Sequence, residues 1–375
     1  MKKGIMIVFL FMIISILFLP KKEETKETRG VFISYIEISE YLQDKEEKES
    51  KEQVIKMIQN CENFGLNTII LQVRPSMDAI YDSKTFPTSK YLSSTGSYSY
   101  DVLHYFLEEC HKRNIKLIAW INPYRVSTTG TIKDVKENSP VYKYIGSDIL
   151  YENNGVFLNP ARKESTNLIK KGVEELVKYP IDGLLMDDYF YPGEEVDDLE
   201  YQKVSGTIPK EEFRYQAINE MVEEVHKICK ENNITFGISP EGNLENNYHK
   251  NYADIKTWLK EEYVDFIMPQ LYYGFENTGQ PFVETSNNWQ NMNQKNIPLY
   301  IALSLYKVGK EDSYAREGRT EWIENNNIIQ KEIIHSRSLK NYKGFILYRY
   351  DNLFEEKLFT ETSQKEIENV LEIIK

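Results

Sequence analysis

Eight short apolar segments recur along the chain, and each ends in polar or aromatic residues before a stretch of helical character begins. They are residues 30–35, 67–73, 116–122, 183–189, 235–239, 265–272, 299–306 and 344–350. Their hydrophobicity is nearly continuous rather than alternating, which is typical of strands that are covered on both faces of a parallel sheet. The pattern therefore predicts eight buried parallel strands.

The stretches between these segments repeat apolar residues at helical spacing, as at Val54, Ile58 and Cys61, and Asp101 is placed to cap one such helix. Strands that alternate with helices predict βαβ units, and eight units predict closure into a single (β/α)8 TIM barrel of the α/β class. An open doubly wound sheet would need a glycine-rich phosphate turn after its first strand, and the sequence SYIEISE that follows is not one. The connection after the third strand is long, and we expect its first part, residues 127–144, to run irregularly over the barrel mouth and to wall a cleft, with a helix only in its second half.

The chain begins with a segment of different character. Lys2 and Lys3 precede an apolar run from Ile5 to Leu19, which is the pattern of a secretory signal. No small-residue cleavage site follows, so residues 1–20 are predicted to be either a signal peptide or a membrane anchor, with membrane association through residues 5–19. Residues 21–29 are predicted to be a charged tether and residues 30–375 the barrel domain. Either reading predicts an extracytoplasmic protein, secreted or anchored to the outer face of the cell membrane.

Composition narrows the possible partners. The formal net charge is −12 and the pI is near 5.2, so we expect no nucleic-acid partner. The three cysteines, Cys61, Cys110 and Cys229, fall on predicted helices and are expected to be small core residues rather than disulfide partners. No histidine falls at a strand end and no His-Glu-x-x-His motif occurs, so we expect neither a metal nor a cofactor.

The ends of the predicted strands are rich in amide, carboxylate and aromatic side chains, and barrels of this class hold their active sites at the carboxyl ends of the strands. Such a set suits a polysaccharide, because sugar hydroxyls bind amides and carboxylates and sugar ring faces stack on aromatic rings. The predicted substrate-binding residues are Gln72, Arg74, Asp78, Asn122, Tyr124, Tyr189, Asn243, Gln270, Tyr272 and Tyr306.

Cleavage of a glycosidic bond needs two carboxylates as a minimum. Asp187 falls on the same side of its strand as Leu185, which we expect inside the barrel, whereas Asp188 points away unless the strand has begun to curl. Asp187 is the first catalytic candidate, and Asp188 and Glu241 are candidates for the second carboxylate. A helix cap or an ion pair would also account for the aspartates, and a solvated loop for Glu241. Arg74 is expected to pair with a site carboxylate, although a structural ion pair is the alternative.

The blocks LQVRPSMDAIYDSKTFP, AWINPYRVS, IDGLLMDDYFYP, FGISPEGN, DFIMPQLYYG and YIALSLYKVG resemble the signature of the glycosyl-hydrolase-like family 10, over about Arg29 to Asn352. The resemblance implies a (β/α)8 barrel distantly similar to α-amylase-type hydrolases. It also implies activity on bacterial cell-wall glycan, since some members cleave strands that have lost their peptides. Fold-level analogy puts Asp187 in the place of the nucleophile. Many members have an apolar or small residue at the position of Glu241, which weakens its candidacy. The motif positions that the family carries over are Gln72, Arg74, Asn122, Tyr124, Asp187, Asp188, Gln270, Tyr272 and Tyr306.

The sequence thus predicts an exported glycoside hydrolase acting on peptidoglycan glycan. Asp187 would be nucleophile or general base, and Glu241 or Asp188 the general acid. Retaining, inverting and substrate-assisted routes all remain open. The alternative is a barrel that binds cell-wall glycan without cutting it, which would be favoured if only Asp187 faced the cleft.

Overall fold

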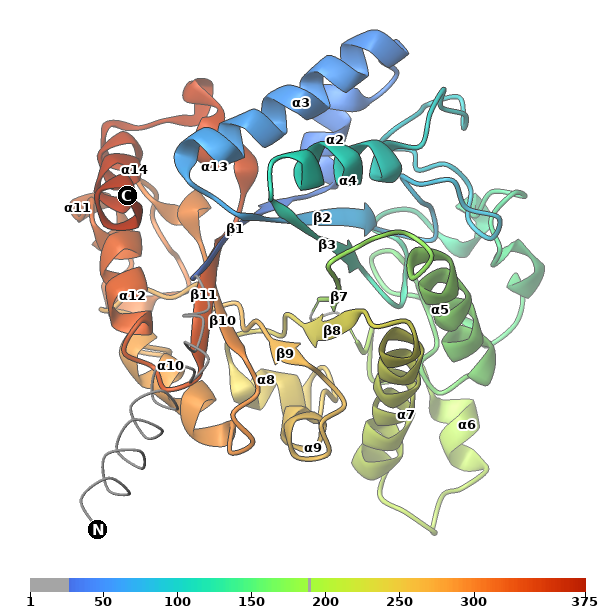
Figure 1. The fold of residues 1–375 in the computed structure, drawn as a ribbon. Coiled ribbons are helices and arrows are strands. Elements are labelled where there is room, and N and C mark those ends of the chain that lie inside the picture. Colours follow the sequence, from blue (N-terminus) through green and yellow to red (C-terminus); the bar gives the residue numbers. More distant parts are fainter. Residues whose placement is uncertain (1–26, 188–189) are drawn as a thin grey trace, which may run out of the picture.

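The computed structural model describes residues 27–187 and 190–375, and within this part of the chain eight parallel strands close into a barrel (Figure 1). The order around the ring is β1-β11-β10-β9-β8-β7-β3-β2, so neighbours in the barrel are successive strands of the barrel along the chain. The predicted (β/α)8 barrel is confirmed. Its strands are β1 (Thr28–Ile33), β2 (Thr68–Arg74), β3 (Lys116–Ile121), β7 (Gly183–Met186), β8 (Thr235–Ile238), β9 (Phe266–Ile267), β10 (Leu299–Leu303) and β11 (Tyr342–Leu347).

Helices surround the barrel, and their buried apolar stripes face the strands (Figure 1). Asp101 caps α4 as expected, because its carboxylate accepts a hydrogen bond from the His104 backbone amide at 2.9 Å. The larger helices are α3 (Glu47–Phe64), α4 (Val102–Lys112), α5 (Lys163–Leu176), α7 (Lys210–Glu231), α10 (Phe282–Met292), α12 (Ile328–Ser336) and α14 (Glu361–Ile374). The shorter ones are α2 (Tyr35–Leu42), α6 (Asp198–Gln202), α8 (Leu244–His249), α9 (Ile255–Lys260), α11 (Glu321–Glu324) and α13 (Tyr350–Phe354).

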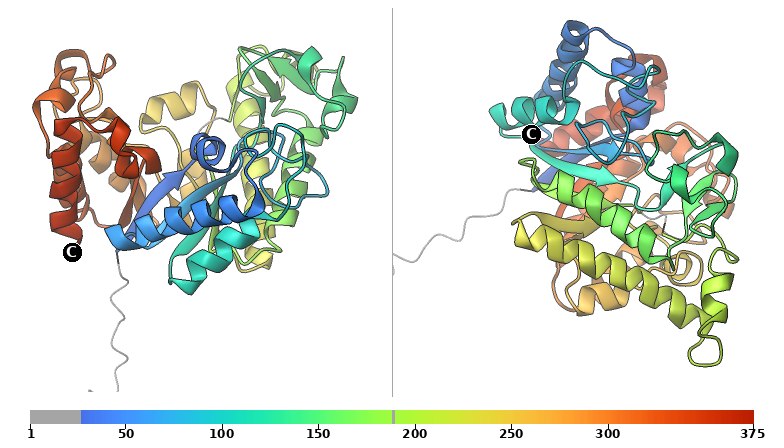
Figure 2. Two further views of the ribbon diagram at one scale, coloured as in Figure 1. Left: turned by 90° about the horizontal axis from the view of Figure 1, so that it is seen from above. Right: turned by 90° about the vertical axis from the view of Figure 1, so that its right-hand side faces the viewer.

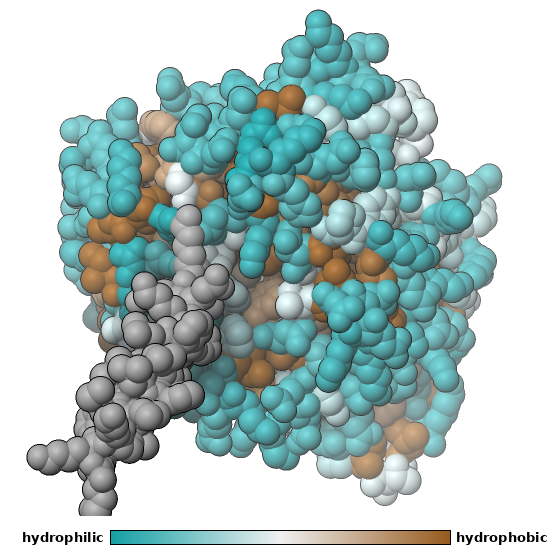
Figure 3. Space-filling view, in the orientation of Figure 1, coloured by the Kyte–Doolittle hydropathy of each residue, from teal (hydrophilic) through white to brown (hydrophobic). Residues whose placement is uncertain are grey.

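The three cysteines lie in the helix layer, where all are buried and none forms a disulfide. They act as small core residues, as the sequence predicted. The predicted signal or anchor segment, residues 1–20, lies outside the described residues. No helix in residues 27–187 and 190–375 is long and apolar enough to cross a membrane. Figure 3 shows that the face of the molecule seen in Figure 1 is mainly hydrophilic.

The interior of the barrel holds a core of its own, separate from the larger core between strands and helices. Side chains alternate along each strand, so an inward residue predicts that the residue two positions later also faces inward. Leu185 faces the interior, so by this rule Asp187, at the carboxyl end of β7, faces the interior as well. The interior core consists of Phe32, Ile70, Trp120, Leu185, Phe266, Met268, Ala302 and Ile346.

Residues 122–162, between β3 and α5, form an insertion whose part from residue 128 to residue 149 is irregular apart from two 3-10 turns, in line with the sequence-based prediction. The small sheet at the two ends of this part was not predicted. Three strands pair antiparallel in the order β4-β6-β5, and two 3-10 turns lie between β4 and β5. Figure 2 (left) shows the insertion, in green, on one side of the barrel end and the segments after β10 and β11, in orange to red, on the other. The elements are β4 (Arg125–Ser127), β5 (Leu150–Glu152), β6 (Val156–Leu158), η1 (Ile132–Asp134) and η2 (Tyr142–Tyr144).

Candidate active site

A cavity of about 280 Å³ opens at the carboxyl end of the barrel strands, and we call it the central cavity. Its lining combines one carboxylate with aromatic, amide and hydroxyl side chains. Most of these residues stand at or just beyond a strand end, which is where barrels of this class place their chemistry. The lining residues are Phe32, Trp120, Asp187, Ser239, Gln270, Tyr272, Tyr306 and Tyr348.

Asp187 is 4% exposed, and a chain of hydrogen bonds fixes its carboxylate. Trp120 Nε1 donates to Asp187 Oδ2 at 3.3 Å, and Asn122 Nδ2 donates to the same oxygen. Gln72 Nε2 donates to Asn122 Oδ1 at 2.6 Å, and the Tyr35 backbone amide donates to Gln72 Oε1 at 3.0 Å. Each side-chain amide accepts at its oxygen and donates from its nitrogen. The series of hydrogen bonds therefore runs in one direction, from the Tyr35 amide to the Asp187 carboxylate. Two donors on one oxygen favour the ionised carboxylate.

Five aromatic rings form a continuous wall of the central cavity. Tyr272, Tyr306 and Tyr348 contact one another with ring centroids 5.7 to 6.0 Å apart. Phe32 joins this group to Trp120, with centroid distances of 5.5 Å to Tyr348 and 5.4 Å to Trp120. Burial raises the pKa of Tyr306 to about 12, so its phenol stays neutral near pH 7 and can donate a hydrogen bond. The wall offers ring faces and hydroxyl groups to a sugar.

Gln270 and Ser239 complete the polar part of the lining. Gln270 Nε2 donates to the Ser239 carbonyl at 3.0 Å, and the Gln270 backbone bridges to Glu241 on one side and to Ala302 of β10 on the other. Ser239 is buried, and its hydroxyl has no hydrogen-bond partner among the residues that the structure describes. The structure therefore brings Gln72, Asn122, Asp187, Gln270, Tyr272 and Tyr306 together as the sequence predicted.

Arg74 does not lie in the central cavity, and the expected ion pair with a site carboxylate is wrong. The register of β2 against β3 shifts between Gln72 and Arg74, which is a β-bulge that turns Arg74 away from the interior. The fully buried guanidinium instead stacks 4.6 Å from the Phe86 ring and lies against α5, where a Cβ at Gly172 would come within 1.7 Å of it. Burial lowers the pKa of Arg74.

Three other predicted substrate-binding residues hold the surrounding structure, and none of them lines the central cavity. Tyr124 is fully buried in the core. Asn243 caps α8, accepting from the backbone amides of Glu245 at 2.9 Å and Asn246 at 3.3 Å. Asp78 accepts from Ser89 Oγ at 2.8 Å, and burial raises its pKa. It borders a separate pocket between the β2–α4 loop and the insertion.

The second carboxylate is not found in the described lining. Glu241 is partly buried, and its Oε1 accepts from Asn246 Nδ2 at 2.5 Å, so its side chain is engaged by α8. Asp187 is the sole carboxylate among the described residues that line the central cavity. Asp188 and Tyr189, which the sequence also singled out, lie outside the described residues.

The loop that follows Asp187 is held to α7 by a buried ion pair. Arg214 Nε and Nη2 contact the two oxygens of Asp197 at 2.8 and 2.9 Å, and the Tyr191 hydroxyl donates to Asp197 at 2.8 Å. The guanidinium also lies 4.6 Å from the Tyr252 ring. Burial alone would raise the pKa of Asp197, but the hydrogen bonds from Arg214 and Tyr191 lower it. This clamp fixes Tyr191 and Asp197, which lie four and ten residues beyond Asp187.

Sequence reasoning missed Phe32, Trp120 and Tyr348. Trp120 and Tyr348 each stand two positions from an inward residue, Asn122 and Ile346 respectively, so strand alternation could have found them. The eighth predicted strand was extended to Tyr350, whereas β11 ends at Leu347. Among the described residues, no group of three or more His, Cys, Asp and Glu side chains is placed to hold a metal ion.

Comparison with known proteins gives consistent matches. A family model described as glycosyl hydrolase-like 10 matches residues 27–318. The chain is 28% identical to glycosyl hydrolase YngK of Bacillus subtilis, over 92% of this chain and 72% of that protein. It is 29% identical to glycosyl hydrolase DigH of Escherichia coli, over 80% of this chain and 75% of that protein. Among solved structures, the glycoside hydrolase domain of PgaB from Bordetella bronchiseptica matches with a TM-score of 0.56 at 12% identity, over 92% and 99% of the two chains.

Proposed function

The chain belongs to the glycosyl hydrolase-like 10 family, and from this premise we propose that it hydrolyses glycosidic bonds in bacterial cell-wall glycan. The observation that supports this most is the buried Asp187 carboxylate, held by Trp120 and Asn122 beside a wall of five aromatic rings. A volume of about 280 Å³ lies just under the lower end of ordinary ligand pockets, roughly 300 Å³, and so suits one sugar ring.

In the proposed reaction, the sugar ring stacks on the aromatic wall with its anomeric carbon next to Asp187. The carboxylate attacks that carbon, the bond to the leaving oxygen breaks, and a second acid gives its proton to that oxygen. Water then displaces Asp187 and returns a proton to the second group. Glu241 and Asp188 are the two candidates for the second acid. A route in which the acetamido group of an N-acetylated sugar attacks first is also compatible with the neutral phenol of Tyr306.

The proposed substrate is peptidoglycan glycan from which the peptides have been removed. The resemblance of the motif blocks supports this, and so does the signal pattern of residues 1–20, which would place the enzyme outside the cytoplasm next to the wall. We propose that the protein is secreted or anchored to the outer face of the membrane. Protease treatment of intact cells tests this: full-length protein should be degraded, and a chain starting at Glu27 should be protected.

The substrate is tested by measuring new reducing ends. Purified protein is incubated with amidase-treated sacculi, intact sacculi, chitin and starch. We expect release from the amidase-treated sacculi at least about tenfold faster than from intact sacculi, because attached peptides would have to pass the narrow cavity rim. Equal release from intact sacculi would overturn the preference for peptide-free strands. No release from any of the four would overturn the hydrolase.

A second function is favoured by one observation, namely that Asp187 is the sole carboxylate among the described residues of the central cavity lining. A barrel of this kind could bind wall glycan without cutting it. Sedimentation with amidase-treated sacculi distinguishes the two functions, because a binding protein would co-sediment and release no reducing ends over many hours.

A further inference from the structure

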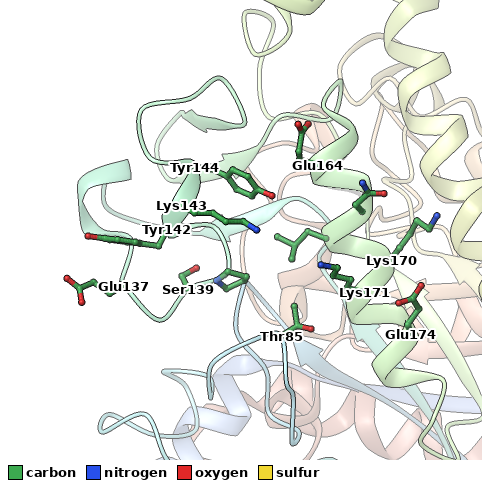
Figure 4. A pocket seen from close by; sticks show the side chains of 13 residues that line it. Thr85, Glu137, Ser139, Tyr142, Lys143, Tyr144, Glu164, Lys170, Lys171 and Glu174 are labelled. Carbon is green, nitrogen blue, oxygen red and sulfur yellow. The ribbon is translucent and has the colours of Figure 1, made fainter.

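A second depression lies on the flank of the barrel, and we call it the flank groove. It has a volume of about 640 Å³ and lies between η2 of the insertion and the outer side of α5 (Figure 4). Thr85 of the β2–α4 loop closes its lower end in this view. None of its lining residues lines the central cavity, so the flank groove is a separate site.

One side of the flank groove presents aromatic residues from η2. Tyr142 is 42% exposed and Tyr144 is partly buried. The Lys143 ammonium lies 4.9 Å from the centroid of the Tyr144 ring, a cation–π contact. Exposed tyrosine rings beside hydrogen-bonding groups are suited to stacking on the C–H faces of sugar rings.

Equal numbers of positively and negatively charged residues line the flank groove. Lys170 contacts Glu224, and Glu164 contacts Arg162 at 3.3 Å, so these two are already paired. Four exposed lining residues form no ion pair with any described residue: two are cations, two are anions, and they are Lys143, Lys171, Glu137 and Glu174. Ammonium groups donate hydrogen bonds and carboxylates accept them, and a sugar hydroxyl does both. This lining suits a glycan strand, because its hydroxyl groups can bind both the ammonium and the carboxylate groups.

We propose that the flank groove binds a distal stretch of the same amino-sugar polymer whose cleavage we propose for the central cavity. The inference rests on that proposed function and extends it to a second glycan site. The link is the insertion: β4 begins three residues after Asn122, which contacts Asp187, and the same insertion continues to η2. A polymer that leaves the central cavity on this side meets the insertion next. A second contact on one strand raises the affinity for long polymers and leaves that for short ones unchanged.

The test compares long and short substrates in variants of the flank groove. The variant is Tyr142→Ala combined with Lys171→Ala, and both side chains are exposed, so the fold should tolerate the changes. On amidase-treated glycan strands we expect kcat/KM to fall about tenfold more than on tetrasaccharide fragments of the same glycan, through a higher KM. The control is Tyr314→Ala, which changes an 88% exposed tyrosine outside the flank groove. It should leave kcat/KM unchanged on both the glycan strands and the tetrasaccharides. An equal effect of the double variant on polymer and tetrasaccharide would overturn the proposal.

Binding without turnover separates this inference from the proposed hydrolysis. In an Asp187→Asn background, the Kd for amidase-treated glycan strands should rise about tenfold when Tyr142 and Lys171 are both replaced by Ala. If wild type releases no reducing ends but this Kd still rises, glycan binding in the flank groove is supported and the proposed hydrolysis is contradicted. If wild type cleaves the strands and the Kd does not change, the proposed hydrolysis is supported and glycan binding in the flank groove is contradicted.

Discussion

The carboxylate of Asp187 is oriented by side chains that bear no charge. Asn122 donates to it, and Gln72 in turn fixes the orientation of Asn122. Gln72 lies in β2, and Asn122 and Asp187 follow directly after β3 and β7. These three strands are neighbours in the barrel, so the side chains meet although Gln72 and Asp187 are 115 positions apart in sequence. Such supporting amides restrict a reactive group to one geometry.

Replacing Asn122 with Ala should lower kcat by about 10²-fold, because a misplaced reactive group costs about that much. Loss of one donor disfavours the ionised carboxylate, so the acidic limb of the pH profile of kcat/KM should move to higher pH. Steady-state kinetics between pH 4 and pH 9 measure both effects. The control is Asn232→Ala, which removes an exposed amide side chain at the end of α7 and should change neither kcat nor the pH profile. An unaltered pH profile in Asn122→Ala would argue against the proposed role of the amide chain.

Strand alternation explains which site residues the sequence could predict. Counting from Leu185 gives Asp187, and the same rule places Asn122 two residues after Trp120. Arg74 was misplaced because the β-bulge between it and Gln72 breaks the alternation. A bulge depends on how β2 pairs with β3, and no local pattern of residues reports that pairing. Asn243 was misplaced for a different reason, because an asparagine after a strand end suits a helix N-cap as well as a binding site. The burial of Asp78 depends on its contact with Ser89, 11 residues further along the chain.

At the scale of elements, the clamp between Arg214 and Asp197 joins α7 to the loop that follows β7. Replacing Arg214 with Met should lower the free energy of unfolding by about 3–5 kcal/mol, because Asp197 would remain buried as an unpaired charge. Urea unfolding measures this. Arg319→Met removes an exposed ion pair with Glu311 and should cost about 0–1 kcal/mol. Equal costs for the two variants would show that the clamp does not stabilise the loop.

The pH dependence of the clamp follows from the pKa of Asp197. Its pKa is lowered in the folded state, so the stabilisation is complete above the ordinary aspartate value of about 3.8 and is lost as the pH falls through the lowered value. The clamp is therefore intact at neutral and mildly acidic pH.

The sequence predicted some helices and strands better than others. The eight barrel strands have continuous apolar runs, and their helices have clear periodicity, so both stand out in the sequence. The strands β4, β5 and β6 have three residues each, which is too short for a period to show. They form because β6 pairs with both partners across the insertion, and such pairing is not local. The position of the insertion and its irregular part were therefore predicted, and its small sheet was not.

At the scale of the whole molecule, a buried acidic group in the helix layer makes stability depend on pH. Glu332 of α12 is fully buried, and neither of its carboxyl oxygens has a hydrogen-bond partner within residues 27–187 and 190–375. Glu366 of α14 lies close enough to affect its ionisation. Burial, and then the nearby Glu366 and Glu321, raise the pKa of Glu332 well above its ordinary value. Burial also raises the pKa of Glu366 to about 7.

A raised carboxyl pKa means that the folded protein keeps a proton that the unfolded chain releases above about pH 4.5. Stability should therefore fall as the pH rises above that value. Glu332→Gln needs no proton, so at pH 8 it should be more stable than wild type by about 1–3 kcal/mol, and at pH 4 the two should be equal. Thermal unfolding across this range measures the difference. Glu372→Gln, an exposed change on α14, should follow wild type at every pH; a Glu332→Gln curve that also follows wild type would refute the argument.

The most direct test of the account is the rate of glycan cleavage by Asp187→Asn. Asparagine keeps the size of the side chain and an acceptor for Asn122, so folding and the Kd for amidase-treated strands should remain as in wild type, while kcat should fall by about 10³-fold or more. Asp82→Asn, a change at an exposed aspartate, serves as the matched control. Release of reducing ends by Asp187→Asn at a rate within about tenfold of wild type would contradict the central role of this carboxylate.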